Sequence, residues 1–384
     1  MPELRFPGFE GEWEEKKLES IIKVNSGKDY KHLDKGDIPV YGTGGYMTSV
    51  SEPLSEIDAV GIGRKGTINK PYLLEAPFWT VDTLFYCTPK KETDILFILS
   101  LFRKINWKVY DESTGVPSLS KQTINKINRF VPTNKEQQKI GKFFSKLDRQ
   151  IELQEQKLEL LQQQKKGYMQ KIFSQELRFK DENGNDYPEW ENVMLQKVLK
   201  DKTEGIKRGP FGGALKKDIF VESGYAVYEQ RNAIYDISNF RYYINENKYK
   251  EMQSFSVQPN DIIMSCSGTI GRLALIPHNY TKGIINQALI RFRTNHKIRS
   301  EFFLIFMRSN QMQRKILEAN PGSAITNLVP VKELKLIPFP LPVKFEQDKI
   351  SQFIHIINRR IEQSEKKIES LKNRKQGFLQ KLFV

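Results

Sequence analysis

The side chains that most often perform acid–base or metal chemistry are sparse in this sequence. The cysteines, Cys87 and Cys266, lie far apart without CxxC spacing, a pattern typical of a reducing compartment and of a chain without disulfides or zinc. The histidines are not grouped at the spacings that metal ligands or a catalytic base require. They are His32, His278, His296 and His355. We therefore expect no catalytic residue and no metal site.

Motifs for phosphate and methyl-transfer chemistry are also missing from the sequence. No G-x-x-x-x-G-K-[ST] loop is present to hold the phosphates of ATP. The nearest approach to the (Asp/Asn)-Pro-Pro-aromatic motif of amino-methyltransferases is Asn320-Pro321-Gly322-Ser323, which lacks the second proline and the aromatic residue. We interpret it as a turn, and GTGG (Gly42–Gly45) as a tight turn.

The balance of charge is the strongest bulk property. The 384-residue chain has 61 lysine and arginine residues against 46 aspartate and glutamate residues, a formal charge of +15. Such an excess indicates a polyanionic partner, with nucleic acid as the leading candidate. The alternatives are a basic protein without such a partner or an anionic membrane surface, although no Lys/Arg block or basic amphipathic anchor supports a membrane. No apolar run approaches the roughly 18 residues of a membrane span, and no leader opens the chain, so we expect a cytoplasmic protein.

Basic and polar residues in the loops are the candidates for contact with double-stranded DNA. Arginine can bind guanine and asparagine or glutamine can bind adenine in the major groove, while lysine and serine more often hold phosphate. A solvated surface position is an equally good interpretation of each residue alone, so we consider them as a set. In the first half of the chain they are Lys28, Tyr30, Lys31, Tyr41, Thr43, Arg64, Lys65, Thr67 and Ser113. In the second half they are Lys207, Arg208, Gln230, Arg231, Asn232, Ser267, Thr269 and Ser323.

The elements that must position these residues are written twice. Residues 131–174 align without a gap on residues 341–384, with about 18 identities. The segments that open the two halves also match, as LRFPGFEGEWEEKKL from Leu4 and LRFKDENGNDYPEWENVML from Leu177. This is an internal duplication whose second copy has the longer body. The last residues of the chain, followed by its first residues, repeat the sequence in the middle of the chain. This predicts a pseudo-dimer, in which the two halves of one chain are related as the two subunits of a homodimer are.

Apolar residues in the repeated tails alternate at spacings of three and four, the pattern of a coiled-coil seam. The seam residues are Ile140, Phe144, Leu147, Ile151, Leu158, Leu161, Ile172, Ile350, Ile354, Ile357, Ile361, Ile368, Leu371 and Leu382. Two long helices related by a two-fold axis would pair antiparallel. Gln154 and Ser364, which interrupt the two seams, would then meet as a small polar layer.

Each body is a succession of short apolar runs separated by Gly, Pro, Asn and Asp, which predicts short strands with a few helices. Strands are expected in IPVYGTGGY (38–46) and in DIIMSCSGTIGRLALI (261–276), and helices at 95–104 and 300–318. The fold class is therefore α+β: two globular domains related by a pseudo-two-fold axis and joined by two long helices in an antiparallel coiled coil.

The order of these pieces resembles the specificity subunit of type I restriction-modification systems. The resemblance covers the whole chain and rests on a helix that opens with P-x-x-x-E-Q after each body, in VPTNKEQQKI (131–140) and LPVKFEQDKI (341–350). It implies target recognition domains at 1–134 and 175–344 and conserved spacer helices at 135–174 and 345–384. Each recognition domain would read one half of a bipartite DNA site.

The resemblance also implies partners. The helices would set the spacing and dock two methyltransferase subunits, to which restriction or translocase subunits are added. S-adenosylmethionine would belong to the methyltransferase and ATP with Mg²⁺ to the restriction subunits, with no cofactor on this non-catalytic chain. Two alternatives stay open: a subunit of a modification-only or type IIB-like system, and a coiled-coil scaffold without DNA specificity.

Overall fold

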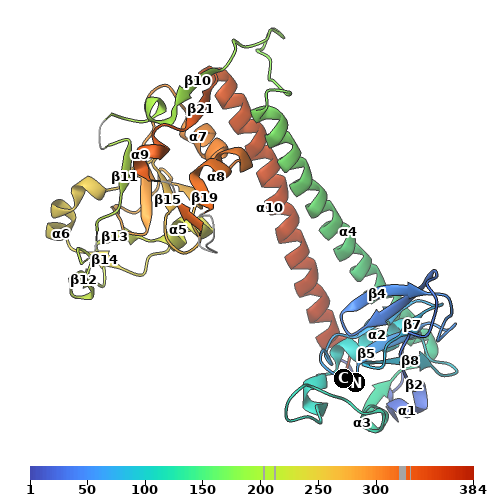
Figure 1. Cartoon of the computed structure of the whole chain (residues 1–384). Coiled ribbons are helices and arrows are strands. Elements are labelled where there is room, and N and C mark those ends of the chain that lie inside the picture. The colour runs from blue at the N-terminus through green and yellow to red at the C-terminus, as the bar shows by residue number, and fades with distance from the viewer. Residues whose placement is uncertain (202–203, 212, 320–325, 329) are drawn as a thin grey trace. The chain divides into compact units, whose positions relative to one another are not determined.

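The chain folds into two compact units, which we describe separately. The computed structural model describes residues 1–201, 204–211, 213–319, 326–328 and 330–384 (Figure 1). Unit 1 comprises Met1–Glu159 together with Gln363–Val384, and unit 2 comprises Leu160–Glu362. Unit 1 is thus built from both ends of the chain. The long helices α4 (Asn134–Phe173) and α10 (Lys344–Lys381) each contribute to both units.

The body of unit 1 is a mixture of short strands and short helices. Its strands are β1 (Glu14–Lys17), β2 (Ile22–Ser26), β3 (Ile38–Gly42), β4 (Gly45–Val50), β5 (Ala59–Gly63), β6 (Tyr72–Leu74), β7 (Trp79–Thr80), β8 (Leu84–Pro89) and β9 (Asn128–Val131). Its helices are α1 (Leu18–Ile21), α2 (Ile95–Lys104) and α3 (Lys121–Lys126), with a 3₁₀ turn at Trp107–Tyr110. Helix α2 lies where the sequence predicts it, because Asp94 caps its first turn by accepting from the Phe97 amide at 2.8 Å.

The strands of unit 1 form three sheets. One is antiparallel with the order β2-β8-β5-β6, a second has the order β4-β3-β7, and β1 pairs with β9. In the second sheet β3 runs antiparallel to β4 and parallel to β7. Helix α2 packs its buried face against the main hydrophobic core, which also includes Phe144 of α4 and Phe383 near the end of the chain.

The body of unit 2 is larger but follows the same plan. Its strands are β10 (Glu191–Met194), β11 (Ile206–Arg208), β12 (Phe220–Val221), β13 (Tyr225–Tyr228), β14 (Tyr243–Ile244), β15 (Ile262–Ser265), β16 (Leu273–Leu275), β17 (Gly283–Ile285), β18 (Leu289–Phe292), β19 (Leu317–Ala319), β20 (Thr326–Leu328) and β21 (Pro338–Leu341). Its helices are α5 (Gln230–Tyr235), α6 (Glu246–Glu251), α7 (Ser300–Met307), α8 (Asn310–Ile316) and α9 (Val331–Leu334), with 3₁₀ turns at Leu195–Val198, Lys217–Ile219 and Gln253–Phe255.

The sheets of unit 2 match those of unit 1 in topology. The sheet β11-β18-β15-β16 corresponds to β2-β8-β5-β6 in unit 1. In the sheet β12-β14-β13-β17, strand β13 is antiparallel to β14 and parallel to β17, as β3 is antiparallel to β4 and parallel to β7 in unit 1. The single helix expected at 300–318 is divided into α7 and α8, because Ser309 caps α8 by accepting from the Met312 amide. Both units are thus α+β bodies of one design, as the duplicated sequence predicts.

The segments of α4 and α10 that belong to unit 1 pair antiparallel. Phe143 packs against Phe378 with ring centroids 5.0 Å apart, and the Nζ of Lys372 lies 2.7 Å from Oε1 of Glu155. A later residue of α4 therefore contacts an earlier residue of α10, so the two helix segments in this unit are antiparallel, as expected. The polar layer expected from Gln154 and Ser364 is not held by a hydrogen bond between them, because the Oγ of Ser364 has no partner within the described residues.

Burial along the two helices follows the expected seam. The buried members are Ile140, Phe144, Leu147, Ile151, Ile172, Ile350, Ile354, Ile357, Ile368, Leu371 and Leu382. Leu158, Leu161 and Ile361 are half-buried. Ser364 is buried, and its Oγ has no hydrogen-bond partner within the described residues.

The matching motifs at the start of each half and at the start of each long helix bind one another. In unit 1 the Arg5 guanidinium donates to both oxygens of Glu136 at 2.8 Å, from Nε and Nη2. In unit 2 Arg178 donates in the same way to Glu346, at 2.8 and 3.0 Å. This bidentate, charge-assisted contact gives a physical reason for the repeated arginine and glutamate.

The glutamine after each of these glutamates ties the long helix to the body. Gln137 accepts from the amide of Asp94, and Gln347 accepts from the amide of Arg299. Asp94 and Arg299 are the N-cap residues of α2 and α7, so the two helices hold equivalent places. The Leu4 amide donates to the carbonyl of Lys381 at 3.0 Å, and the Leu177 amide donates to Lys171 at the same distance. The first residues of the chain therefore close unit 1 beside its last helix, where Figure 1 marks both termini.

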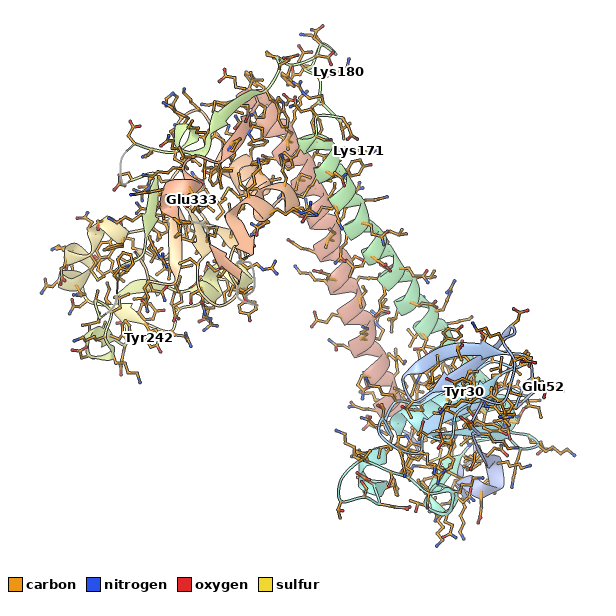
Figure 2. The ribbon with its side chains drawn as sticks, viewed as in Figure 1. Tyr30, Glu52, Lys171, Lys180, Tyr242 and Glu333 are labelled. Carbon is orange, nitrogen blue, oxygen red and sulfur yellow. The ribbon has the colours of Figure 1, made fainter. Side chains whose placement is uncertain are left out.

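Figure 2 shows the side chains on this framework, with Lys171 on α4 and Lys180 in the segment that follows. Within the described ranges, no helix combines the length and the apolar character needed to cross a bilayer.

Candidate nucleic-acid interface

The connection between β7 and β8 gathers several candidate segments of unit 1. The Lys28 amide donates to the carbonyl of Thr80, and the Val81 amide donates to the carbonyl of Tyr41. The Arg64 amide donates to the carbonyl of Thr83 at 2.8 Å. Three segments far apart in sequence are thus fixed to residues 80–83 by backbone hydrogen bonds. This arrangement brings the candidates at 28–31, 41–43 and 64–67 together.

A second loop, at 111–118, joins this group through Asp111. The carboxylate accepts from the amides of Ser113 and Ser118, at 3.0 and 2.9 Å, and from the Ser113 hydroxyl. The hydrogen bonds from Ser118 and then Ser113 lower the pKa of Asp111. The Gly66 amide donates to the Pro117 carbonyl, so this loop is tied to the Arg64–Thr67 turn. Ser113 therefore lies in the same loop cluster as Arg64 and Lys65.

The unit 1 candidates differ in how far their side chains reach solvent. Lys28, Lys31, Arg64 and Lys65 are exposed, and Tyr30, Tyr41, Thr43, Thr67 and Ser113 are half-buried. Tyr30, labelled in Figure 2, packs against the small core of Val40, Val50 and Trp79. Exposed cations beside half-buried aromatic and hydroxyl groups can hold phosphate and approach base edges.

In unit 2 the turn after β15 is the centre of the candidate set. Ser267 and Thr269 are exposed on either side of Gly268, whose φ of +64° is a left-handed conformation that favours glycine. A Cβ at Gly268 would lie 3.4 Å from Oε1 of Gln230, so the Gln230 side chain reaches this turn. That oxygen is buried and accepts no hydrogen bond within the described residues.

Arg208 joins the same turn from β11. Burial raises the pKa of the Cys266 thiol, and the charge and hydrogen bond of the adjacent Arg208 oppose that rise. The guanidinium carbon also lies 5.8 Å from the ring centre of Phe211. Arg208, Gln230 and the Ser267–Thr269 turn therefore come together in unit 2.

Other candidates of unit 2 have structural roles or lie apart. Asn232 is buried and fully bonded: its Oδ1 accepts from the Glu229 amide, and its Nδ2 donates to the carbonyls of Ile237 and Asn239. It has no free donor for a base, so we remove it from the set. The ammonium of Lys207 lies 4.7 Å from the ring centre of Phe255, on the opposite side of β11 from Arg208. Arg231 is half-buried, and Ser323 lies outside the described residues.

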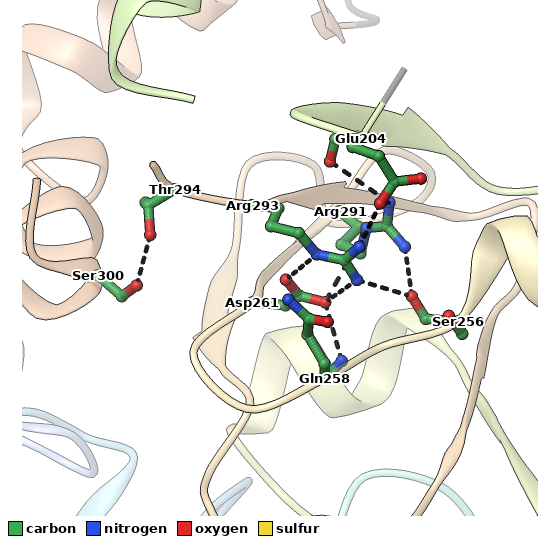
Figure 3. A network of polar contacts seen from close by, with 8 residues as sticks. All are labelled: Glu204, Ser256, Gln258, Asp261, Arg291, Arg293, Thr294 and Ser300. Atoms are coloured by element: carbon green, nitrogen blue, oxygen red, sulfur yellow. Dashed lines mark hydrogen bonds and ion pairs between the residues drawn. The ribbon is translucent and has the colours of Figure 1, made fainter. Parts of the chain in front are cut away.

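An ionic network that is buried except for Glu204 fixes the strands that carry the Ser267 turn (Figure 3). Arg293 donates to both oxygens of Asp261 at 2.8 Å, and Arg291 and Arg293 both bond to Glu204 and to the Ser256 carbonyl. Asp261 immediately precedes β15, and Arg291 lies within β18. The network therefore anchors one end of β15, and the other end leads into the turn at 267–269.

Sequence reasoning missed some exposed aromatic side chains near these loops. The side chain of Phe211 is 79% exposed beside Arg208, and that of Tyr46 is 64% exposed next to the GTGG turn. An aromatic residue inside a glycine-rich loop, as in RGPFGG, is the signal that could have found Phe211. Such side chains are suited to stacking or to wedging against bases.

The comparisons with known proteins agree with this architecture. A sequence model of the type I restriction modification DNA specificity domain matches residues 10–163 and 212–373. The chain is 25% identical over 298 residues to a protein of Methanocaldococcus jannaschii named for the specificity subunit of the MjaX type I restriction enzyme, covering 76% of this chain and 67% of that protein. It is 24% identical over 349 residues to the MjaVIII specificity subunit of the same organism, covering 86% of this chain and 76% of that protein.

Solved structures show the same fold at low identity. The S subunit of a type I restriction-modification system from M. genitalium matches with a TM-score of 0.64 and 15% identity, over 100% of this chain and 99% of that one. A chain from a structure of type I R-M complex assembly and conformational transition matches with a TM-score of 0.56 and 14% identity, over 96% of both chains. With two matches to the family domain, one on each body and its helix, this chain belongs to the type I restriction-modification DNA specificity family and is the specificity subunit of such a system.

Proposed function

We propose that each unit reads one half of a bipartite DNA target. The observation that carries this proposal is that two bodies of the same topology present different side chains at their candidate loops. Unit 1 offers Arg64 and Lys65 beside Ser113, and unit 2 offers Arg208 and Gln230 beside Thr269. A shared scaffold with unlike loops is suited to two unlike half-sites.

The contact set that we propose excludes Asn232, whose hydrogen bonds are internal, and Lys207, whose ammonium packs on Phe255. In unit 1 it consists of Lys28, Tyr30, Lys31, Tyr41, Thr43, Arg64, Lys65, Thr67 and Ser113. In unit 2 it consists of Arg208, Phe211, Gln230, Arg231, Ser267 and Thr269. Arginine and glutamine would select bases, and lysine and serine would hold phosphates.

The remaining parts of the proposal concern partners. The target recognition domains are 1–134 and 175–344, and the spacer helices at 135–174 and 345–384 set the half-site spacing and dock two methyltransferase subunits. The chain itself performs no chemistry: S-adenosylmethionine is bound by the methyltransferase, and ATP with Mg²⁺ by restriction subunits. The complex acts in the cytoplasm.

The test is a methylation map. The full chain is purified with its methyltransferase subunit and incubated with S-adenosylmethionine and genomic DNA, and methylated adenines are located by single-molecule sequencing. We expect a bipartite motif with an unread gap, and exchange of one body for that of a relative should alter only one half of the motif. Methylation without a bipartite motif would refute the two-reader proposal and favour a scaffold.

A single-residue version uses Arg64→Ala with Arg149→Ala as its control. Arg149 is an exposed arginine on α4, outside the candidate loops, whose partner is Glu152; its loss would change at most the extent of methylation and should leave the motif unchanged. Loss of a base-reading arginine costs about 1–3 kcal/mol of discrimination, or roughly 5- to 150-fold, at one position. A motif that stays identical in the Arg64→Ala complex would remove Arg64 from the base-reading set.

A further inference from the structure

Unit 1 contains a small ion cluster that joins α2, α4 and α10. Asp148 on α4 accepts from Arg103 at the end of α2 and from Lys375 on α10. Burial, followed by the charge of Arg103, lowers the pKa of Lys375, and the hydrogen bond to Asp148 opposes this effect. One carboxylate therefore compensates two half-buried cations.

The equivalent place in unit 2 keeps the cations and lacks the carboxylate. In the repeat, Lys165 stands where unit 1 has Lys375, and Asn358 stands where unit 1 has Asp148. Arg308 corresponds to Arg103, because each follows the N-cap residue of its helix by the same number of positions. Burial, and then the charge of Arg308, lowers the pKa of Lys165, so the two cations interact without the anion that unit 1 places between them.

A cavity of about 960 Å³ opens at this place between α4 and α8. Its basic lining residues are Lys165, Lys166, Arg308, Arg314 and Lys315. None of the described residues that line it is an aspartate or a glutamate. Arg308 has a carboxylate partner elsewhere, since its Nη2 lies 3.2 Å from Oδ2 of the exposed Asp236. The cavity therefore gathers four exposed cations around the half-buried Lys165 with no carboxylate in its lining, an arrangement suited to an anion.

We propose that this cavity binds a phosphate group of the DNA backbone and so supplies affinity that does not depend on sequence. The inference rests on the proposed function, which provides the DNA. Lysine and arginine side chains suit phosphate oxygens, and a contact with phosphate carries no direct information on base identity. Unit 1 fills the same position with its own carboxylate, so the site belongs to unit 2 alone.

The sharpest test restores the unit 1 arrangement with Asn358→Asp. The new carboxylate should pair with Lys165 and Arg308 and should not lower the melting temperature of the full chain, because unit 1 already uses this combination. The matched control is Asn373→Asp, the same substitution at an exposed position of the same helix. Both variants change the net charge equally, so a difference between them in DNA binding is due to the cavity and not to the overall charge.

The readout is the salt dependence of DNA binding by fluorescence anisotropy over a series of KCl concentrations. One phosphate contact contributes about 0.9 to the slope of log K against log salt, so Asn358→Asp should reduce the slope by about 1 and the affinity at 0.1 M salt by roughly eightfold. The loss should be equal for duplexes with and without the methylated motif, and Lys165→Gln should act in the same direction. Asn373→Asp should leave the slope close to that of the unaltered chain.

Several outcomes would overturn the inference. Equal slopes for Asn358→Asp and Asn373→Asp would show that no phosphate of DNA enters the cavity. A different outcome is that inorganic phosphate stabilises the unaltered chain and not Asn358→Asp, while the slopes of log K for DNA against log salt stay the same. That result would assign the cavity to a free anion. Weaker binding of the methyltransferase with unchanged DNA slopes would assign it to a protein partner. Failure of the proposed function is distinct, because the unaltered chain would then bind duplexes with and without the motif equally.

Discussion

Glu346 is the residue whose replacement tests the junction between spacer helix and body most directly. Its carboxylate is fully buried and accepts three hydrogen bonds: two from Arg178, at 2.8 and 3.0 Å, and one from Nε1 of Trp190 at 2.8 Å. In Glu346→Gln the amide nitrogen can only donate, so it would face a donor of Arg178 or Trp190. Breaking a buried ion pair costs about 3–5 kcal/mol, and because the guanidinium is 22% exposed we expect the lower end, about 3 kcal/mol.

Unit 1 supplies an internal comparison for this prediction. Glu136 accepts the same two hydrogen bonds from Arg5, but Nε1 of Trp13 is buried without a partner within the described residues. Glu136→Gln should therefore be less destabilising than Glu346→Gln, by about 1–3 kcal/mol for the missing indole contact. The double replacement Arg178→Met with Glu346→Gln should cost much less than Glu346→Gln alone, since it removes both charges together and leaves an amide oxygen to accept from Nε1 of Trp190.

The assay is urea unfolding of the full chain, followed by circular dichroism and by tryptophan fluorescence, with midpoint and slope fitted for each transition. We expect the transition that includes unit 2 to move to lower urea in Glu346→Gln and to recover most of that shift in the double variant. Unchanged midpoints in Glu346→Gln, or a double variant as unstable as the single one, would refute the reasoning that this ion pair secures the helix.

Three further predictions use other parts of the structure. Gly209→Ala should disrupt the Arg208 loop, because a Cβ there would lie 1.8 Å from the carbonyl oxygen of Asn286. Loss of DNA affinity with an unchanged circular dichroism spectrum would support this prediction, and unchanged affinity would contradict it. Asp111→Asn should release the 111–118 loop and remove hydrogen-exchange protection at the Ser113 and Ser118 amides. Since the pKa of Asp111 is lowered in the folded chain, the same release should occur in the unaltered protein only as the pH falls below the ordinary aspartate range. Cys87 and Cys266 are buried with raised thiol pKa values, so both should react with a thiol reagent only after unfolding, and rapid native labelling would contradict their burial.

Much of the architecture could be predicted from the sequence, because it depends on local patterns that are repeated. The duplicated tails predict α4 and α10, and the apolar run after Asp94 predicts α2 at the bounds that the structure shows. Periodicity does not determine how two helices slide along one another, so it could not reveal that Gln154 and Ser364 form no hydrogen bond with each other. Register depends instead on particular pairs such as Lys372 with Glu155, which need the folded partner.

The candidate site was harder to predict, since a residue type does not reveal how its side chain is used. Asn232 looks like an adenine-reading residue, yet its amide caps α5 and bonds to the segment beyond it. Arg291 and Arg293 look like surface cations in the run LIRFR, yet they neutralise Asp261 inside unit 2. These roles depend on neighbours far away in sequence, which composition and spacing do not contain.

The composition of unit 1 from both ends of the chain bears on the order of events during synthesis. Unit 2 is continuous, so all of its residues are available once residue 362 has left the ribosome. Unit 1 must wait for Gln363–Val384, because Lys381 bonds to Leu4 and Lys375 bonds to Asp148. Unit 1, whose first residues are made earliest, is therefore completed after unit 2. Synthesis of Gln363–Val384 at 5–20 residues per second takes roughly one to four seconds. A chain that stops after residue 362 would contain all of unit 2 and only part of unit 1, so it would expose the incomplete unit 1 to proteases.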